Sequence, residues 1–429
     1  PGSSTPGTRR RRSSRRSLAH AGASSAAERA YSLGRDDNRG SPYRDHSAGA
    51  VSADLLIGVY PPAAPGDALR PRRRAVAFPL DQPGLTLTHL GRGAVWLALR
   101  ALGLGRGSRI AMPAYHCGSE VEAAHLAGVE LDFYRVDAQL RVDEEDLARA
   151  ARGADAAYLI SHFGFPMCAP PPGLRVIEDA AHGLFSAAGD KPLGSRGDAA
   201  VFCPRKSLGV PDGGALLVPA NRERTPAVPG RPAARAMARA TASLLAGRAA
   251  ISHQRGVRSL AARLISRTSR GDAAAREGTL TETVIGEWGL EVADMEAAAR
   301  SPSRVTAGLL GRADASSIRE RRRRNYIALR DELADLTLEP YRELPAGVCP
   351  LYFPVLAEDR ATAIVSLLEH GVRALEVWPV PHPVLDRERF AELEPARRGL
   401  LALPVHQALE PWHVERVLGA AKVVFSGSR

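Results

Sequence analysis

Short apolar runs alternate with helix-like stretches along much of the chain, and this pattern predicts its fold. The runs at 109–113, 130–136 and 156–160 have the length of buried strands, and the stretches at 119–126 and 143–151 have helical spacing. Strands that alternate with helices in this way are typical of βαβ units. We therefore predict an α/β fold in which helices flank a mainly parallel central sheet.

Three further apolar runs lead into polar residues. The run at 175–177 is followed by two carboxylates, the second of which is Asp179, and the run at 199–202 leads into a short basic segment that contains Lys206. A third run at 215–218 comes after a glycine-containing turn. Buried strands of this kind often end at a shared ligand site. We expect the ends of these strands to lie together.

The chain divides into three parts by composition. It has 429 residues, enough for a large core. Residues 1–50 are rich in Ser, Gly, Ala and Arg, which is typical of a disordered basic tail. We expect ordered structure from Phe78, with a large α/β domain at 78–310, and a linking helix with a small C-terminal α/β domain at 311–429. The Ala/Arg-rich stretch at 225–276 has helical spacing; we expect it to pack on the large domain, with a membrane or acidic partner as the alternative.

The net charge of +11 does not by itself indicate a nucleic-acid-binding protein. Much of the excess lies in the tail, where no aromatic residues alternate with the arginines and no nucleic-acid module follows, so we expect no specific nucleic-acid partner. Four consecutive arginines, from Arg321 to Arg324, are expected to form an exposed helix face. The four cysteines lack the spacing of a zinc site or a disulfide framework, so we expect no metal. No run approaches the roughly 18 apolar residues of a membrane span. Since the cysteines indicate no disulfide framework, we expect a location in the reducing cytoplasm.

Lys206 is the first candidate for chemistry because lysine is rare in this chain. Lys and Arg together number 58, but the only lysines are Lys191, Lys206 and Lys422. Arginine supplies positive charge elsewhere, whereas a deprotonated lysine amine is a nucleophile that forms a Schiff base with a carbonyl. The alternative is a surface lysine that follows a strand.

Asp179 makes a cofactor role for Lys206 more specific. A pyridoxal phosphate site needs a lysine for the cofactor's aldehyde and a carboxylate beside the ring nitrogen. Asp179 and Lys206 each follow an apolar run, and such positions can lie side by side in a sheet. We therefore predict that Lys206 binds pyridoxal phosphate and that Asp179 keeps the ring nitrogen protonated. The alternative for Asp179 is the N-cap of a helix that begins at Ala180.

Several motifs around these two residues follow one another in order. I-E-D-A-A-H is followed by G-S-x-G-D, F-x-x-x-K and D-G-G, and H-F-G-F-P precedes them. This series resembles the DegT/DnrJ/EryC1/StrS aminotransferase family, and the resemblance extends over about residues 85–425. It implies the fold of the type I pyridoxal phosphate enzymes, with a large domain and a smaller C-terminal α/β domain. It also implies a homodimer.

The resemblance implies a phosphate site at the start of the helix-like run at 95–102. Gly91, Arg92 and Gly93 stand where the family has Ser-Gly-Thr, and backbone N–H groups at a helix start can bind a phosphate. Cys203 stands where shorter forms of the motif have a serine that contacts the phosphate.

The resemblance also implies contacts with the cofactor ring. Tyr115 and His116 are the candidates for stacking, because a flat π face can hold a pyridine ring; the commonest stacking position of the family falls on Cys117. His182 stands where the family has Gln or His near the ring and its phenolic oxygen. If a helix follows Asp179, His182 and Asp179 share one face of it.

The activity implied is transfer of an amino group from an amino acid, glutamate by family analogy, to a keto-sugar. We expect the sugar to be linked to a nucleotide and the product to serve polysaccharide or secondary-metabolite amino-sugar biosynthesis. Residues 287–290 stand where the family often has an Asn-containing loop from the other subunit, and they lack its pattern. Two alternatives stay open: another pyridoxal phosphate reaction, such as a lyase or an amino-acid-directed transfer, and a non-catalytic binding or regulatory descendant of the fold.

Overall fold

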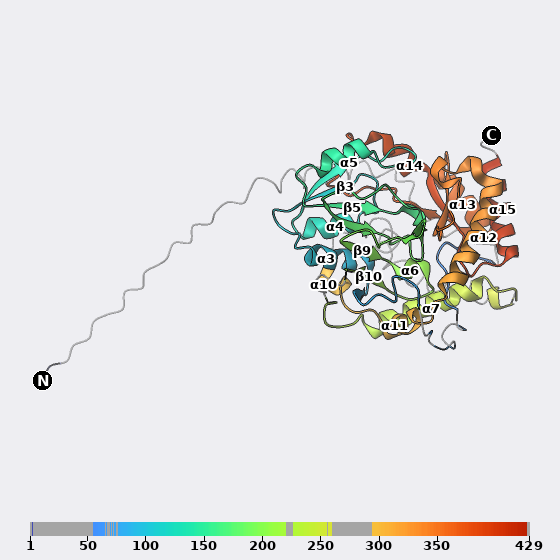
Figure 1. Cartoon of the computed structure of the whole chain (residues 1–429). Coiled ribbons are helices and arrows are strands. Elements are labelled where there is room, and N and C mark those ends of the chain that lie inside the picture. Colours follow the sequence, from blue (N-terminus) through green and yellow to red (C-terminus); the bar gives the residue numbers. More distant parts are fainter. Residues whose placement is uncertain are drawn as a thin grey trace. The chain divides into compact units, whose positions relative to one another are not determined.

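Seven strands form the central sheet of this chain in a computed structural model (Figure 1). They are β2 (Leu85–Thr88), β3 (Arg109–Pro113), β4 (Glu130–Tyr134), β5 (Ala156–Ile160), β6 (Arg175–Asp179), β9 (Ala199–Phe202) and β10 (Gly214–Leu217). Their order is β2-β10-β9-β6-β5-β3-β4. The five strands from β9 to β4 are parallel, and β10 is antiparallel to β9 and β2. The sheet is therefore mainly parallel, as predicted.

The structure describes most of the chain after residue 54. The described residues are 55–64, 76–219, 226–254, 256–259 and 294–426, with Gly2, Gly66, Leu69, Pro71 and Arg73. All of them except Gly2 belong to one unit, Val51–Arg429. The predicted tail (Gly2 apart), 260–276 and 287–290 lie outside the described residues. Within this described part, no helix is both long and apolar enough to cross a membrane, and no three His, Cys, Asp or Glu side chains form a metal-binding group.

Helices cover the central sheet and connect its strands. α3 (Gly91–Ala101) packs against β9 and β10, α4 (Ser119–Leu126) packs against α3 and β4, and α5 (Glu144–Ala151) packs against β4 and β3. The sheet side of α3 is built from small and apolar residues, among them Ala94, Leu97 and Ala98, which are buried. The remaining elements of this part are η3 (His162–Gly164), β7 (Ala187–Ala188), β8 (Lys191–Pro192), α6 (Pro204–Ser207), α7 (Ala234–Ala250), α10 (Met295–Ala298) and α11 (Arg304–Leu310).

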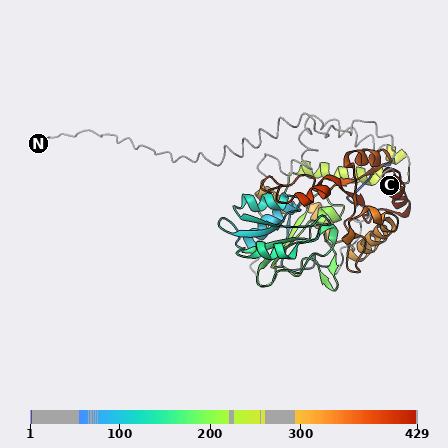
Figure 2. The ribbon, with the colours of Figure 1, turned by 90° about the horizontal axis from the view of Figure 1, so that it is seen from above.

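A smaller antiparallel sheet forms the centre of the C-terminal part. Its strands, in order, are β11 (Tyr352–Leu356), β14 (Leu400–Pro404) and β13 (Leu375–Glu376). The helices α12 (Ala315–Leu333), α13 (Arg360–Glu369) and α15 (Pro411–Phe425) gather on the side away from α3, α4 and α5 (Figure 1, Figure 2). The other elements are η5 (Ala334–Leu336), η6 (Glu339–Tyr341), β12 (Val372–Arg373), η7 (Ala391–Leu393) and α14 (Glu394–Gly399). The domain boundary at residue 310 stays a prediction.

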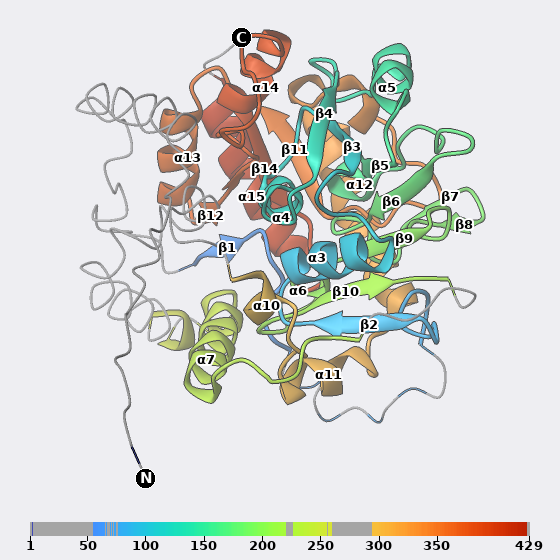
Figure 3. The same ribbon diagram turned by 90° about the vertical axis from the view of Figure 1, so that its left-hand side faces the viewer.

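Ordered structure begins before Phe78, where the sequence placed its start. β1 (Ile57–Gly58) pairs in parallel with β12, and Ile57 is completely buried. Figure 3 shows β1 close to β12 and beside α7. A two-residue strand carries no periodic pattern, and its partner lies near the other end of the chain, so no local pattern predicts it.

The Ala/Arg-rich stretch forms a helix over its described part. This helix is α7, on which only Ala250 is buried. Its described contacts are with the segment ahead of the central sheet: the N–H of Leu56 donates to the carbonyl of Ala250 at 3.4 Å, and the N–H of Ala63 donates to that of Leu244 at 3.3 Å. The arginine face of α7 is largely exposed.

The four consecutive arginines of α12 do not form one exposed face. Arg321 and Arg324 are exposed, whereas Arg322 is only 1% exposed. Arg323 donates to the carbonyls of a nearby loop, with 3.0 Å to that of Val348. Successive residues of a helix point about 100° apart, so four in a row cannot share one side. The prediction of an exposed face is wrong for Arg322.

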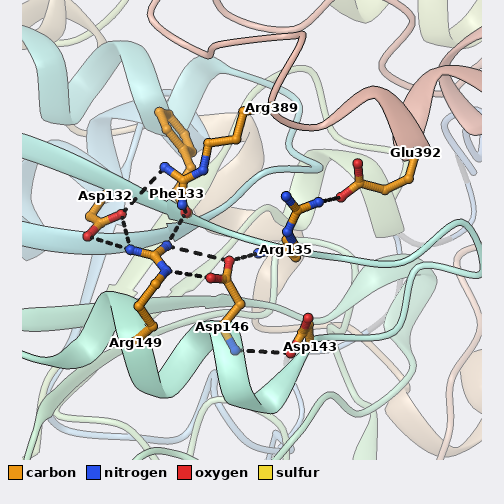
Figure 4. Close-up of polar contacts among 8 residues, drawn as sticks. All are labelled: Asp132, Phe133, Arg135, Asp143, Asp146, Arg149, Arg389 and Glu392. Atoms are coloured by element: carbon orange, nitrogen blue, oxygen red, sulfur yellow. Dashed lines mark hydrogen bonds and ion pairs between the residues drawn. The ribbon is translucent and has the colours of Figure 1, made fainter.

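Ion pairs fasten the edge strand β4 to its neighbours (Figure 4). Arg149 on α5 donates to both carboxylate oxygens of Asp132, at 3.0 and 3.1 Å, and also pairs with Asp146. Arg149 and Arg389 both donate to the carbonyl of Phe133, at 2.9 and 3.1 Å. Because two guanidinium groups occupy this carbonyl, the edge of the sheet is blocked to a further strand there.

A loop of the C-terminal part is tied to the same edge. Arg135 Nη1 lies 2.6 Å from Glu392 Oε1, and the backbone N–H of Arg135 donates to Asp146 at 2.7 Å. The guanidinium groups of Arg389 and Arg135 lie 4.8 and 5.7 Å from the ring centroid of Phe390. This cluster therefore links the central sheet to the loop before α14.

We predict that Arg149→Leu lowers the free energy of unfolding by about 1–2 kcal/mol, because it removes several partly buried hydrogen bonds to two carboxylates. Urea unfolding followed by circular dichroism measures the change. The matched control is Arg152→Leu, at an exposed arginine next to the end of α5, which should change stability by no more than about 0.5 kcal/mol. Equal losses in the two variants would contradict the assignment.

The effect of Arg149→Leu should depend on pH. Burial by itself raises the pKa of Asp146. The hydrogen bonds from Arg149 and Arg135 together lower this pKa by more than burial raises it, so the net shift is downward. A carboxylate with a lowered folded-state pKa contributes stability above its usual pKa of about 4, and this contribution is lost as the pH falls below that value. The stability difference between wild type and Arg149→Leu should therefore shrink on acidification.

Candidate functional site

The carboxyl ends of three parallel strands bring Asp179 and Lys206 to one edge of the central sheet. Ile160 at the end of β5 is level with Asp179 at the end of β6, and Asp179 is level with Val201 in β9. Lys206 follows β9 on the short helix α6. Open α/β sheets bind ligands at this edge.

The side chain of Lys206 contacts His182. Nζ lies 3.0 Å from Nε2 of the imidazole. The backbone N–H of Phe163 donates to Nδ1 at 3.3 Å, so the ring proton lies on Nε2, on the side of Lys206. Burial lowers the pKa of His182 well below its usual value, and the charges of Lys206 and His162 act in the same direction. His182 is therefore a neutral imidazole that donates from Nε2.

His182 lies on a turn, because no helix follows Asp179. The expectation of a shared helix face, and the alternative that Asp179 is a helix N-cap, are therefore wrong. Asp179 Oδ1 instead accepts the N–H of Ala181 at 2.8 Å and closes the turn locally. Gly164 of the H-F-G-F-P motif packs on this turn: its φ is +90°, and a Cβ there would lie 2.9 Å from the carbonyl oxygen of His182.

Asp179 is a buried carboxylate, and each of its two oxygens accepts one hydrogen bond from the protein. It is 8% exposed, and Oδ2 accepts the hydroxyl of Tyr158 at 2.7 Å. Burial raises the pKa of Asp179, and the hydrogen bonds from Ala181 and Tyr158 and the charge of Lys206 offset only part of this shift. A cationic group of a ligand next to Asp179 would favour its ionised form.

Opposing influences act on the amine of Lys206. Burial lowers its pKa, whereas Cys117, Cys203, Tyr60 and Asp179 raise it when they are ionised, and the net shift is upward. Attack on an aldehyde requires the uncharged form of this amine, which burial favours and the neighbouring acidic groups oppose.

Glu178 points to the opposite face of β6 from Asp179, because side chains alternate along a strand. Its carboxylate accepts one hydrogen bond from the guanidinium of Arg196 at 3.1 Å and another from the backbone N–H of the same residue at 3.2 Å. Asp198 accepts the N–H of Val176 at 2.9 Å. The G-S-x-G-D motif therefore holds β6 in place, and Glu178 belongs to a structural ion pair.

The D-G-G motif joins the segment after Lys206 to the start of α3. Asp212 is completely buried; it accepts the N–H and hydroxyl of Ser303 at 2.7 and 2.8 Å and lies 3.0 Å from Nδ1 of His89. A Cβ on Gly214 would lie 2.4 Å from the carbonyl oxygen of Leu90, so only glycine allows this approach.

Gly91 and Cys203 lie next to each other at the start of α3. A Cβ on Gly91 would lie 3.5 Å from Cys203 Sγ. No side chain caps this helix and no acidic residue lies in its first turn, so its first N–H groups and its dipole suit an anion. The side chain of Arg92 is half-buried and makes no hydrogen bond to the described residues. The start of α3 is therefore compatible with a phosphate site, and binding of a phosphate there stays a prediction.

Gly93 has a packing role. A Cβ at this position would lie 2.1 Å from the backbone oxygen of Ala298 in α10. The close contact between α3 and α10 therefore requires glycine. The N–H of Gly93 donates to the carbonyl of Leu90 at 3.1 Å, and its binding to a phosphate stays a prediction.

Tyr115 and His116 are completely buried, and both rings contact protein groups. The hydroxyl of Tyr115 donates to the carbonyl of Val377 at 2.9 Å, and the guanidinium of Arg397 lies 5.1 Å from its ring centroid. The His116 ring stacks on Phe133 with 5.5 Å between centroids. Stacking of either ring on a cofactor stays a prediction.

Sequence reasoning missed two residues near this site. The Trp378 ring lies 5.4 Å from that of His182, and its φ of +47° is unusual for a bulky residue. Glu120 is buried and accepts the thiol of Cys117 at 2.8 Å; burial and the nearby Asp179 raise its pKa. Trp378 comes from the C-terminal part, far away in sequence. Glu120 lies three residues after Cys117, the commonest stacking position of the family, and this spacing was the one sign in the sequence that Glu120 could lie near the site.

Comparisons with known proteins agree with the resemblance. Residues 86–227 match the model of the DegT/DnrJ/EryC1/StrS aminotransferase family. UDP-N-acetyl-3-dehydro-alpha-D-glucosamine 3-aminotransferase of Acidithiobacillus ferrooxidans is 31% identical over 150 residues, which are 31% of this chain and 39% of the relative. Spore coat polysaccharide biosynthesis protein SpsC of Bacillus subtilis is 31% identical over 134 residues, 29% of this chain and 34% of the relative. The chain thus spans well under half the length of these curated relatives.

Solved structures share the fold over most of the chain. Aminotransferase TlmJ from Streptoalloteichus hindustanus has a TM-score of 0.53 at 18% identity and covers 80% of this chain and 86% of its own. DesV from S. venezuelae has a TM-score of 0.51 at 19% identity, with 80% and 85% covered. Spr1654 from Streptococcus pneumoniae, solved in a PLP form, has a TM-score of 0.57 at 14% identity, with 87% and 100% covered. The chain has the predicted fold of type I pyridoxal phosphate transferases.

We predict that Gly93→Ala lowers the free energy of unfolding by about 1–3 kcal/mol, because the added methyl group forces α3 and α10 apart. Gly105→Ala is the control. Its Cβ would meet the oxygen of Ala127 at an ordinary 3.7 Å, so this variant should keep or slightly raise stability. Urea unfolding of both variants tests the difference, and a stable Gly93→Ala protein would contradict the packing account.

Proposed function

We propose that this chain, whose residues 86–227 match the DegT/DnrJ/EryC1/StrS aminotransferase family, is an aminotransferase that depends on pyridoxal phosphate. One observation carries the proposal: Asp179 ends β6 and Lys206 follows β9, so a lysine and a buried carboxylate lie at the ends of two adjacent parallel strands. These are the two groups that such a cofactor requires.

The surroundings of Lys206 fit this cofactor chemically. The uncapped start of α3, beside Cys203, offers backbone N–H groups for a phosphate. Ser161 Oγ and His162 Nε2 follow β5 at the same sheet edge; both are buried and have no hydrogen-bond partner among the described residues. Buried polar atoms are normally hydrogen-bonded, so unpaired ones at a strand end support a ligand site.

Each residue of the site has a separate task in this proposal. When bound, pyridoxal phosphate supplies an aldehyde and an electron-withdrawing ring. Lys206 would hold the cofactor through Nζ, and its free amine would move a proton to and from the substrate carbon with the same atom. Asp179 accepts a hydrogen bond from the ring nitrogen and keeps it cationic. His182 donates from Nε2 to an oxygen of the ligand.

We further propose that the amino donor is an amino acid, glutamate by family analogy, and that the acceptor is a keto-sugar linked to a nucleotide. Support comes from the curated relatives, one of which is named for a UDP-linked dehydro-sugar and the other for polysaccharide biosynthesis. The homodimer and the cytoplasmic location stay predictions.

We predict that the wild-type chain with added pyridoxal phosphate shows a visible absorption band that glutamate diminishes. Lys206→Ala should show no such band, because it lacks the amine that binds the aldehyde. Lys191→Ala removes an exposed lysine and should behave as wild type. Absorption spectra of the three proteins provide the measurement.

Other results of this experiment would discriminate between the alternatives. No band in the wild type would overturn the cofactor proposal. A band that no amino donor changes would favour a non-catalytic descendant of the fold. A band that amino donors change, without amination of any keto-sugar nucleotide, would favour another pyridoxal phosphate reaction.

We also predict that Asp179→Asn slows the change of the band with glutamate by about 10²–10³-fold, because the ring nitrogen loses its charged partner. Stopped-flow absorption measures this rate. Glu178→Gln is the matched control: it changes the neighbouring carboxylate, which pairs with Arg196 on the other face of β6, and should affect stability but not the rate. Equal slowing in both variants would argue against a role for Asp179 at the ring.

A further inference from the structure

Arg322 is a buried cation whose acceptors are all uncharged. It lies on α12 and is one of the largest completely buried side chains. Burial lowers its pKa, which reflects the cost of placing a charge away from water. Such a cost must be offset by hydrogen bonds or by an opposite charge. A neutral side chain of similar size would fill the same space without this cost, so the charge itself calls for an explanation.

Four hydrogen bonds hold the guanidinium of Arg322. Nε donates to Oε1 of Gln407 at 2.8 Å. Nη1 donates to the carbonyls of Pro350 and Leu351, both at 3.1 Å. Nη2 donates to the carbonyl of Ser207 at 3.0 Å. Arg322 thus connects three segments that are far apart in the sequence.

The carbonyl of Ser207 receives two donors, and both come from the C-terminal part of the chain. Besides Arg322, Nε2 of Gln407 donates to it at 3.0 Å. Gln407 is itself held by Arg322 through its side-chain oxygen and by Arg321, which donates to its backbone carbonyl at 3.0 Å. Both lone pairs of the Ser207 oxygen are therefore used, and the orientation of this peptide group is fixed.

Ser207 directly follows Lys206, so its carbonyl belongs to the same short helical turn, α6. At its other end the turn is held by the N–H of Lys206, which donates to the carbonyl of Cys203 at 3.0 Å. With both ends fixed, the lysine side chain starts from a defined backbone position and reaches His182 at 3.0 Å. The cation also lies at the carbonyl end of α6, where positive charge is favourable.

We propose that Arg322 is a positioning residue for Lys206, which it holds beside His182 by fixing the carbonyl of Ser207. The proposal rests on the function proposed for Lys206. Its test uses the protein without cofactor, so that its failure can be told apart from failure of the proposed function.

The test is competitive acetylation of the unloaded full chain with acetic anhydride over a series of pH values, read by mass spectrometry. The chain has only three lysines, and the exposed Lys191 and Lys422 serve as internal references. We expect Arg322→Gln to raise the apparent pKa of Lys206 by about half a unit or more, because the cation bonded to the carbonyl of the next residue, Ser207, is lost. We also expect its labelling relative to the references to rise at least twofold at high pH, because the turn is no longer held.

Arg324→Gln is the matched control, since it removes an exposed arginine of the same helix and should leave the labelling of Lys206 unchanged. Arg322→Lys keeps the charge but not the fork of hydrogen bonds. It should restore the apparent pKa of Lys206 while the labelling at high pH stays elevated.

If Arg322→Gln does not fold, as judged by circular dichroism, Gln407→Met provides the second test. It removes one donor to the Ser207 carbonyl without changing any charge, and should raise the labelling of Lys206 at high pH with little change in its apparent pKa. Wild-type labelling of Lys206 in a folded Arg322→Gln protein, or in Gln407→Met, would overturn the proposal. Because Cys117, Cys203, Tyr60, Asp179 and His182 surround the amine, all variants keep them unchanged.

Discussion

The parallel register of β5, β6 and β9 is the constraint on which the candidate site depends. It places the ends of the three strands at one level, with Asp179 between Ile160 and Val201. Each strand end then delivers a different polar group to one edge of the sheet. The alternation of side chains along β6 separates two adjacent carboxylates, so that Glu178 becomes a structural ion pair and Asp179 faces Tyr158.

Backbone carbonyls, rather than carboxylates, accept most hydrogen bonds of Arg322 and Arg397, the buried arginines of the described part of the chain. Arg397 donates to the carbonyls of Ala114 and Trp378, and its guanidinium lies over Tyr115. Arg322 does the same for the turn that follows Lys206. In both cases an arginine of the C-terminal part of the chain donates hydrogen bonds to a segment that follows a strand at the carboxyl edge of the central sheet. A rigid edge of this kind suits a site in which one amine must reach a ligand in a fixed geometry.

Local pattern was a reliable guide to the elements of the fold. The strands at 156–160 and 199–202 lie where the apolar runs placed them, because residues buried on both faces of a sheet leave a continuous apolar signature. The helix at 119–126 lies where its helical spacing predicted it. The resemblance to the DegT/DnrJ/EryC1/StrS family is confirmed over residues 86–227. Contacts between segments far apart in the sequence left no such apolar pattern by which they could be predicted. β1 is two residues long and pairs with β12 near the other end of the chain, so its existence depends on tertiary packing.

The sequence by itself determined the class of fold, the edge of the sheet at which a site would form, and Lys206 and Asp179 as its candidate pair. Only the tertiary structure decided which side chains surround that pair. It brought Trp378 next to His182, paired Glu120 with the thiol of Cys117, and turned one of four consecutive arginines into the core. The physical reason is that periodicity records whether a residue is buried, whereas the identity of its neighbours depends on segments that meet only when the chain folds.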